Sequence, residues 1–231
     1  MNASSKILAL DTATTGCSVC LWSAGVVLGE RAEEMARGQA QALVPMMQGV
    51  LNDADVAPDA IDAVAVTRGP GAFTGLRIGL SAARAFAMAL GVPCVGVTTL
   101  EAVAENVTED ERVGRKTLVC IESKRADIFV QLFDADLKAL TEPLAVGEDA
   151  LAGLFSDGEA LVLVGDAAVR AKDMLGQAEL DVLMSTASPL PVAATVARIA
   201  SARIEGAQTP EPLYLRPPDA KLPKNAGRAR P

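Results

Sequence analysis

The sequence predicts an α/β protein built of two lobes, and three features of the chain support this prediction. Short apolar segments follow one another closely near the N-terminus, as in a meander of β-strands. Alternating helix and strand patterns come next, which is typical of βαβ units. A charged linker at 108–116 then separates this series from a second, shorter one. At roughly 150 residues per domain, the 231 residues provide one large domain or two small lobes.

In the first part of the chain, strands are predicted at 6–11, 17–22, 26–33, 63–67 and 93–97. A helix is predicted over 39–53 because apolar side chains recur on one face at helical spacing. These side chains are Leu43, Met46, Met47, Val50 and Leu51. Pro45 is tolerated if this helix starts nearby, and otherwise it kinks the helix.

Two more helices are predicted from their starting residues. Residues 68–74 form a loop rich in glycine and proline, and Thr74 is the expected N-cap of a helix over 75–90. Thr98 or Thr99 is the expected N-cap of a helix over 98–106, with Glu101 near the position that completes a capping box.

After the linker, strands are predicted at 117–121, 128–133 and 161–164, and helices at 147–155, 166–175 and 192–204. We therefore expect an N-terminal lobe at 1–107, a smaller C-terminal lobe at 108–216 and a flexible tail at 217–231. A strand meander that leads into alternating α/β elements, followed by a second lobe, fits the actin-like ATPase (ASKHA) fold.

The composition argues against several classes of function. The chain has no histidine, which excludes Ser–His and Cys–His dyads, histidine general bases and histidine-ligated metal sites. A net charge of −8 argues against a protein that binds RNA by itself. We expect no catalytic residue and no metal site in this chain.

The four cysteines lie in apolar segments, which predicts buried, reduced thiols. Cys17 and Cys20 lie on one predicted strand at an odd spacing, so their side chains should face opposite sides of the sheet. No apolar stretch reaches the ~18 residues of a membrane span, and the first residues lack the pattern of a signal peptide. These features predict a cytoplasmic protein.

Two segments have features of phosphate-binding loops. Asp11 ends the first strand, and Thr12 and Thr14 follow it in a turn that can hold an anion, although such residues also form an ordinary turn. The loop at 68–74 places glycines before a helix N-terminus, which is either a natural anion site or a tight strand-to-helix turn.

Several of these segments together resemble the signature of the TsaB family. They are ILALDTAT at 7–14, RGPGAFTGLRIG at 68–79, GVTTL at 96–100 and EPLYLR at 211–216, with QALVPMM at 41–47 as the first helix. The match is dense over 6–101, sparse through the second lobe, and returns at 211–216.

The resemblance implies a degenerate relative of TsaD, the subunit that transfers threonylcarbamoyl to an adenosine of tRNA. It implies a non-catalytic accessory subunit that binds and activates TsaD as a heterodimer, with the ATPase TsaE joining them. No cofactor is expected, apart from ATP or ADP shared with the partners, and tRNA is expected to be contacted only through the complex. Asp11, Thr12 and Thr14 then form a degenerate phosphate loop. The metal-binding histidine pair of TsaD would fall at 39–43, where Gln39 and its neighbours are poor metal ligands.

Two enzymatic alternatives stay open at this point. An ATPase or kinase of the actin-like fold would use Asp11 to organise a metal, but the chain lacks the adjacent glycines of an adenosine-binding segment. A metalloprotease-like enzyme is opposed by the absence of histidine. In the basic tail from residue 221 onward, a solvated end and a contact with tRNA are both open.

The partner interface is predicted on the helices over 39–53 and 75–90. The second helix is apolar on most sides, which its own sheet cannot cover alone, and methionines suit adaptable surfaces. The interface residues are Leu43, Met46, Met47, Val50, Phe73, Leu76, Leu80 and Ala83. Two such helices against two from a partner would form a four-helix contact, and the same surface would allow a homodimer when TsaD is absent. The alternative is that both helices are buried only in their own lobe.

Overall fold

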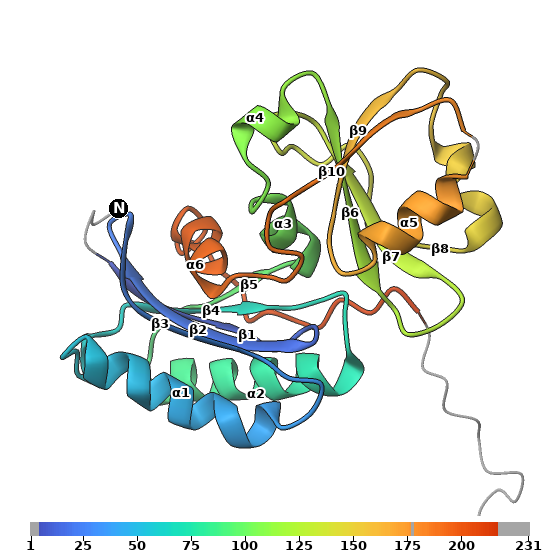
Figure 1. The fold of residues 1–231 in the computed structure, drawn as a ribbon. Coiled ribbons are helices and arrows are strands. Elements are labelled where there is room, and N and C mark those ends of the chain that lie inside the picture. The colour runs from blue at the N-terminus through green and yellow to red at the C-terminus, as the bar shows by residue number, and fades with distance from the viewer. Residues whose placement is uncertain (1–4, 177, 217–231) are drawn as a thin grey trace, which may run out of the picture.

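The computed structural model describes residues 5–176 and 178–216, which form two five-stranded sheets with helices packed on them (Figure 1). The first sheet has the strand order β3-β2-β1-β4-β5. Its strands are β1 (Lys6–Asp11), β2 (Gly16–Ser23), β3 (Val26–Glu34), β4 (Ala63–Thr67) and β5 (Cys94–Val97). The first three strands form the predicted antiparallel meander, and β4 pairs with β1 and β5 in parallel.

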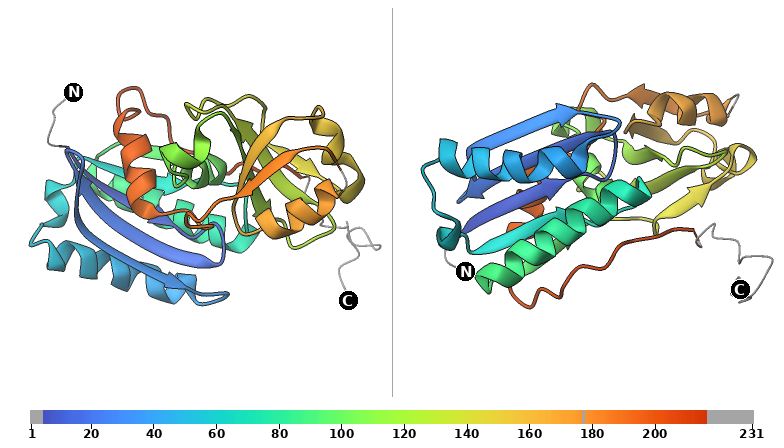
Figure 2. Two further views of the ribbon diagram at one scale, coloured as in Figure 1. Left: turned by 45° about the horizontal axis from the view of Figure 1, so that its top comes forward. Right: turned by 90° about the horizontal axis from the view of Figure 1, so that it is seen from below.

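Helices cover both faces of the first sheet. On one face, α1 (Gln39–Asp53) and α2 (Phe73–Leu90) lie side by side, and α6 (Ala193–Ser201) covers the other (Figure 2). Side chains of β1 alternate between two cores: Leu8 packs with α1 and α2, whereas Ile7 packs with α6. Strands β1, β2 and β4 are thus buried on both sides, whereas the edge strand β3 is largely exposed.

The second sheet has the order β10-β9-β6-β7-β8. Its strands are β6 (Lys116–Glu122), β7 (Ile128–Phe133), β8 (Leu144–Val146), β9 (Ala160–Val164) and β10 (Asp181–Met184). On one face it packs against α5 (Ala168–Leu175). On the other it packs against α3 (Thr99–Ala104), which connects the two lobes through Leu100 and Val103.

Some predicted elements differ in the structure. The helix predicted at 147–155 is instead two 3-10 turns, η2 (Glu148–Ala150) and η3 (Ala152–Leu154), because only Leu151 is buried and no apolar stripe holds a longer helix. The linker contains a short helix, α4 (Glu109–Arg112), whose capping box is formed by Thr108 and Glu111. A 3-10 turn, η1 (Pro58–Ala60), precedes β4.

The structure also tests the predicted N-caps of two helices and the predicted orientations of Cys17 and Cys20. The capping box of Thr98 and Glu101 is confirmed. The predicted N-cap at Thr74 is wrong, because α2 begins at Phe73 and Ala72 is its N-cap. The opposite orientations of Cys17 and Cys20 are confirmed, since the two thiols belong to different cores.

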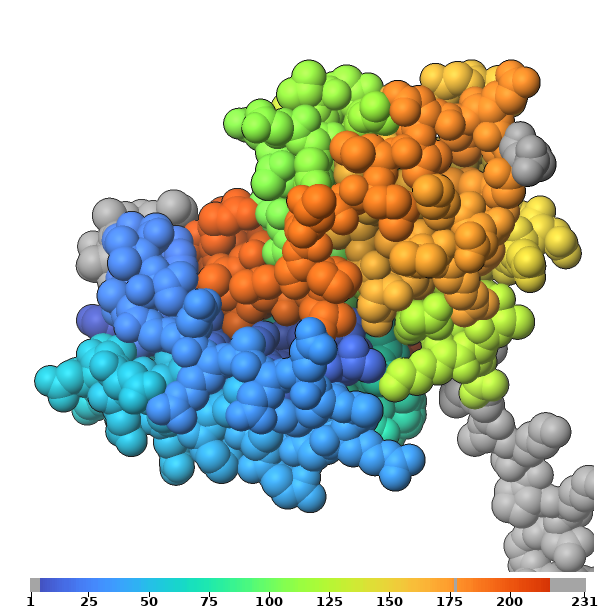
Figure 3. All heavy atoms as spheres, in the orientation of Figure 1, coloured from blue at the N-terminus to red at the C-terminus, as the bar shows by residue number. Residues whose placement is uncertain are grey.

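The chain returns to the first lobe after β10. The orange segment that follows β10 runs from the second lobe down to the first sheet (Figure 3), where α6 buries Val196, Ala197 and Ala200 against it. The lobes at 1–107 and 108–216 stay a prediction, and α6 shares its core with the first sheet. The predicted tail at 217–231 lies outside the described residues. Across 5–176 and 178–216, no helix combines the length and apolarity that a membrane span requires.

Burial on α1 leads to a stability prediction. Val50 is 0 % exposed and Val44 is 50 % exposed on the same helix. Val50→Glu should unfold the protein, because an unpaired buried carboxylate costs several kcal/mol out of a total of roughly 5–15. Val44→Glu should remain folded. Thermal melts of both variants test this, and a Val50→Glu protein that melts like the wild type would contradict the observed packing.

Candidate functional site

The two lobes enclose a cleft of about 950 Å³. The first lobe contributes the turn between β1 and β2, the loop between β3 and α1, and the start of α2. The second lobe contributes the turn between β6 and β7, and residues 213–216 complete the wall. Of the residues predicted for the phosphate loop, Thr14 lines this cleft, whereas Asp11 and Thr12 are buried and do not line it.

The start of α2 rests directly on the β1–β2 turn. The amide of Ala72 donates a hydrogen bond to the carbonyl oxygen of Ala13 at 2.7 Å. A Cβ atom at Gly71 would overlap the Ala13 carbonyl oxygen, and one at Gly75 would overlap that of Thr12. These two glycines are therefore required by the close approach of two backbones.

Asp11 is enclosed at the end of β1. Its Oδ1 accepts hydrogen bonds from Thr67 Oγ1 at 2.5 Å and from the Ala13 amide at 3.1 Å. Burial raises the pKa of the Asp11 carboxyl to about 6, and these two hydrogen bonds act in the opposite direction. Through Oδ1, Asp11 thus stabilises the turn between β1 and β2.

The two threonines of the predicted phosphate loop have different surroundings. Thr12 Oγ1 donates to the carbonyl oxygen of Gly75 at 2.7 Å, so its hydroxyl is used within the fold. Thr14 lines the cleft and is 6 % exposed, and its Oγ1 has no hydrogen-bond partner among the described residues. Of the two hydroxyls, that of Thr14 has the unused hydrogen-bonding capacity.

A segment near the C-terminus, Pro210–Arg216, connects the two lobes, and we call it the strap. It runs alongside α2 (Figure 2, right). The Leu213 amide donates to the Arg68 carbonyl oxygen at 2.7 Å, and Arg84 Nε donates to the Pro210 carbonyl oxygen at 2.9 Å. At its end, Arg216 forms an ion pair with Asp127 of the second lobe.

Aromatic contacts hold the strap at the mouth of the cleft. The ring centroids of Phe73 and Tyr214 lie 5.4 Å apart, and the guanidinium carbon of Arg77 lies 3.7 Å from the Phe73 centroid. Arg77 Nε also donates to Tyr214 Oη at 3.1 Å. Phe73 is therefore exposed only in part and contacts this chain's own strap.

The β6–β7 turn is fixed by polar contacts. Ser123 Oγ donates to the carbonyl oxygen of Asp127 at 2.6 Å, and Arg170 Nη2 donates to that of Ala126 at 2.5 Å. Lys124, between them, adopts a left-handed backbone conformation with φ of 59°. The surrounding contacts hold a conformation that a lysine rarely adopts by itself.

The residues predicted for the partner interface lie mainly in the core. Six of them are buried in the cluster between α1, α2 and the first sheet, namely Leu43, Met46, Met47, Val50, Leu80 and Ala83. Leu76 is also buried. Of the predicted set, only Phe73 is exposed. The partner interface on these two helices stays a prediction.

The position expected for a lost metal ligand has a structural role. Gln39 is buried at the start of α1, and its Nε2 donates to the Met35 carbonyl oxygen at 2.9 Å. Among residues 5–176 and 178–216, no group of three or more Cys, Asp or Glu side chains is arranged to hold a metal ion.

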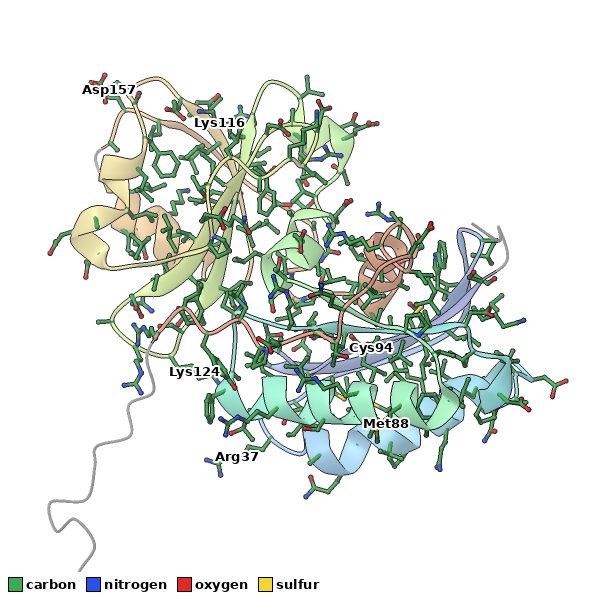
Figure 4. The ribbon with its side chains drawn as sticks, turned by 180° about the vertical axis from the view of Figure 1, so that it is seen from behind. Arg37, Met88, Cys94, Lys116, Lys124 and Asp157 are labelled. Carbon is green, nitrogen blue, oxygen red and sulfur yellow. The ribbon has the colours of Figure 1, made fainter. Side chains whose placement is uncertain are left out.

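Sequence reasoning missed the basic residues of the cleft. Arg37 and Lys124 line it from opposite lobes, and both lie near the start of α2 (Figure 4). Neither belongs to a motif, so their common position follows only from the arrangement of the lobes.

The buried carboxyl of Asp11 predicts a pH-dependent stability difference. Its pKa rises from 3.8 in the unfolded chain to about 6 in the folded protein. The unfolded state therefore loses this proton first, and the folded state is destabilised as the pH rises from about 4 to about 6. Near pH 3.5, Asp11→Asn and the wild type should have similar free energies of unfolding. At pH 7, the free energy of unfolding of Asp11→Asn should be higher by about 2–3 kcal/mol. Urea denaturation at both pH values measures this gap, and a gap independent of pH would contradict it.

Comparison with known proteins identifies the family. The protein-family model described as TsaD, tRNA N6-adenosine threonylcarbamoyltransferase, matches residues 28–152. The tRNA threonylcarbamoyladenosine biosynthesis protein TsaB of Escherichia coli is 35 % identical over 131 residues, which is 57 % of this chain. The match covers 56 % of that relative, or about half its length.

Solved structures agree with this relationship. YeaZ from Pseudomonas aeruginosa superposes with a TM-score of 0.75 and 29 % identity over 91 % of this chain and all of that one. An inorganic polyphosphate/ATP-glucomannokinase from Arthrobacter has a TM-score of 0.50 and 13 % identity over 86 % of this chain and 99 % of its own. That likeness concerns the fold alone, and it confirms the predicted actin-like architecture. From the family model, the relatives and the matching segments, the chain belongs to the TsaB family.

Proposed function

We propose that this protein is a non-catalytic accessory subunit that binds and activates TsaD in the formation of threonylcarbamoyladenosine in tRNA. Membership of the TsaB family supports a role in this biosynthesis, since the Escherichia coli relative is named for it. The absence of histidine from the chain supports a role without catalysis, because the usual general base and metal ligand are missing. In this proposal the protein works in the cytoplasm, TsaE joins the complex, and tRNA is bound through the assembly.

The observation that carries partner binding is the outer surface of α1 and α2, which we call the α1–α2 face. The two helices lie side by side on the first sheet, with their outer surfaces turned away from it (Figure 2). The exposed side chains there include Ala40, Val44, Pro45 and Gln48 on α1 and Ser81, Ala85, Met88 and Ala89 on α2. None of these carries a charge, and an exposed surface of this kind is typical of a protein interface.

The proposed contact with TsaD involves the most exposed apolar side chains of the α1–α2 face. Met88 is 81 % exposed on α2, and Val44 on α1 is the exposed neighbour of the buried Leu43. Partly buried Ile78, Ala82 and Phe86 lie beneath this surface and extend it towards the core. Two helices of TsaD packed on this face would complete a four-helix contact. In the absence of TsaD, two copies of the chain would pair through the same face as a homodimer.

Charge placed on the α1–α2 face should abolish partner binding without unfolding. Val44→Glu and Met88→Glu each bury an unpaired carboxylate in the complex but leave it in solvent in the free protein. We expect at least roughly tenfold weaker binding of TsaD for each variant. The matched control is Val169→Glu, which changes a valine that is 69 % exposed on α5 of the second lobe. Pull-down of TsaD beside thermal melts tests the proposal, and normal binding by both folded variants would refute it.

The isolated protein should not bind tRNA tightly at physiological salt. Its net charge of −8 repels a polyanion, and the affinity should be weaker than micromolar. Filter binding of tRNA to the protein alone, beside the complex with TsaD, measures the difference. Sub-micromolar binding by the isolated chain would instead assign tRNA recognition to this subunit.

A further inference from the structure

A second cavity, of about 310 Å³, lies beside the edge strand β3, and we call it the β3 pocket. Strands β2 and β3 form one wall, and the segment 188–193, which leads into α6, forms the other. In Figure 3 this orange segment lies next to the blue residues of the strand meander. Among the described residues, the β3 pocket and the cleft between the lobes share no lining residue, so the two sites are distinct.

The register of the strands places two glutamates around a serine in this pocket. Ser18 of β2 lies directly opposite Ala32 of β3, and both line the pocket. Glu30 and Glu34 lie two residues before and two residues after Ala32, so their side chains point to the same face of the sheet. Because Ala32 carries only a methyl group, it leaves space beside Ser18 between the two carboxylates.

These polar groups have unused capacity to accept hydrogen bonds. Ser18 is 7 % exposed, and its Oγ has no hydrogen-bond partner among the described residues. The carboxylates of Glu30 and Glu34 form no ion pair or hydrogen bond within the part of the chain that the structure describes. Arg31 also lines the pocket, but its guanidinium is paired with Asp53 of α1 at 2.7 Å. The pocket therefore combines negative charge that is not neutralised with a buried acceptor.

This set of groups favours an organic cation over an anion or a metal ion. The carboxylates repel anions, and among residues 5–176 and 178–216 no acidic cluster is arranged to hold a metal ion. The amides at the start of α6 carry partial positive charge, so a cation is favoured on the β3 side of the pocket. A protonated amine donates up to three hydrogen bonds, which two carboxylates and one hydroxyl can accept.

We propose that the β3 pocket binds a linear polyamine, with one ammonium group held by Glu30, Glu34 and Ser18. The volume of about 310 Å³ exceeds what one ammonium group needs and is at the lower end for small-molecule sites. Glu33, which also lines the pocket, is available to a second ammonium group. Asp11 lines the pocket too, but its Oδ1 is bonded within the fold and is assigned no contact. The proposal does not depend on TsaD or on the α1–α2 face.

Calorimetric titration of the full chain with spermidine tests the site, at about 0.1 M salt to screen distant charges. Glu30→Gln and Glu34→Gln should each weaken binding about threefold, because each removes one carboxylate from the ammonium group. The double variant should weaken binding about tenfold. The matched control is Glu142→Gln/Glu148→Gln, which removes the same charge at two exposed positions of the second lobe outside the pocket. It should change the affinity less than about twofold.

Ser18→Ala separates ligand binding from a structural role. It removes a hydroxyl without a partner in the described residues, so the melting temperature should not fall. Weaker spermidine binding at an undiminished melting temperature supports the proposal, and unchanged binding overturns it. Failure of the wild type to bind spermidine also overturns it, as does an equal loss of affinity in the Glu30→Gln/Glu34→Gln variant and in its control.

Two further probes distinguish a polyamine from other cations. Mg²⁺ that binds as tightly as spermidine overturns the proposal, because the carboxylates then act only as a diffuse negative charge. A tetralysine peptide that binds more tightly than spermidine also overturns it and assigns the pocket to a basic segment of a partner protein. Spermidine that binds more tightly than both probes supports a free polyamine as the ligand.

Discussion

The N-terminus of α2 rests on the turn between β1 and β2, and the rest of the first lobe is arranged around this contact. Only glycine at 71 and 75 lets the two backbones approach, because any side chain would overlap the carbonyl oxygens of Ala13 and Thr12. Thr12 donates a hydrogen bond to the Gly75 carbonyl oxygen across this contact, and the neighbouring Asp11 accepts one from Thr67. It also directs the uncapped start of α2 and the Thr14 side chain into the cleft.

Three parts of the helix α2 lie in different environments. Its inner side, with Leu80, Ala83 and Ala87, belongs to the core of the first lobe. Its outer side carries exposed, mostly uncharged residues such as Met88. Its first turn borders a cleft rich in cations. The proposed partner surface and the cleft therefore use different parts of α2.

The strap explains why a motif near the C-terminus accompanies motifs near the N-terminus. Leu213 is bonded to Arg68, which begins the glycine loop, and a Cβ at Gly69 would lie 2.7 Å from the Leu213 carbonyl oxygen. Tyr214 contacts Phe73 and Arg77 of α2. These residues are adjacent in space although more than a hundred positions separate them, so the two motifs describe one piece of structure.

The sequence by itself determined the two-lobed α/β fold, the strand meander, the capping box of Thr98 and the family. Each of these is recognised from periodicity, helix caps or glycine positions within a short segment of the chain. It also determined that histidine chemistry is absent. Only the tertiary structure decided that Met46, Met47 and Val50 are core residues, since an apolar stripe has the same pattern whether its own sheet or a partner covers it. It alone placed α6 on the first sheet and brought Arg37 and Lys124 to one cleft, because contacts between distant segments leave no local pattern in the chain.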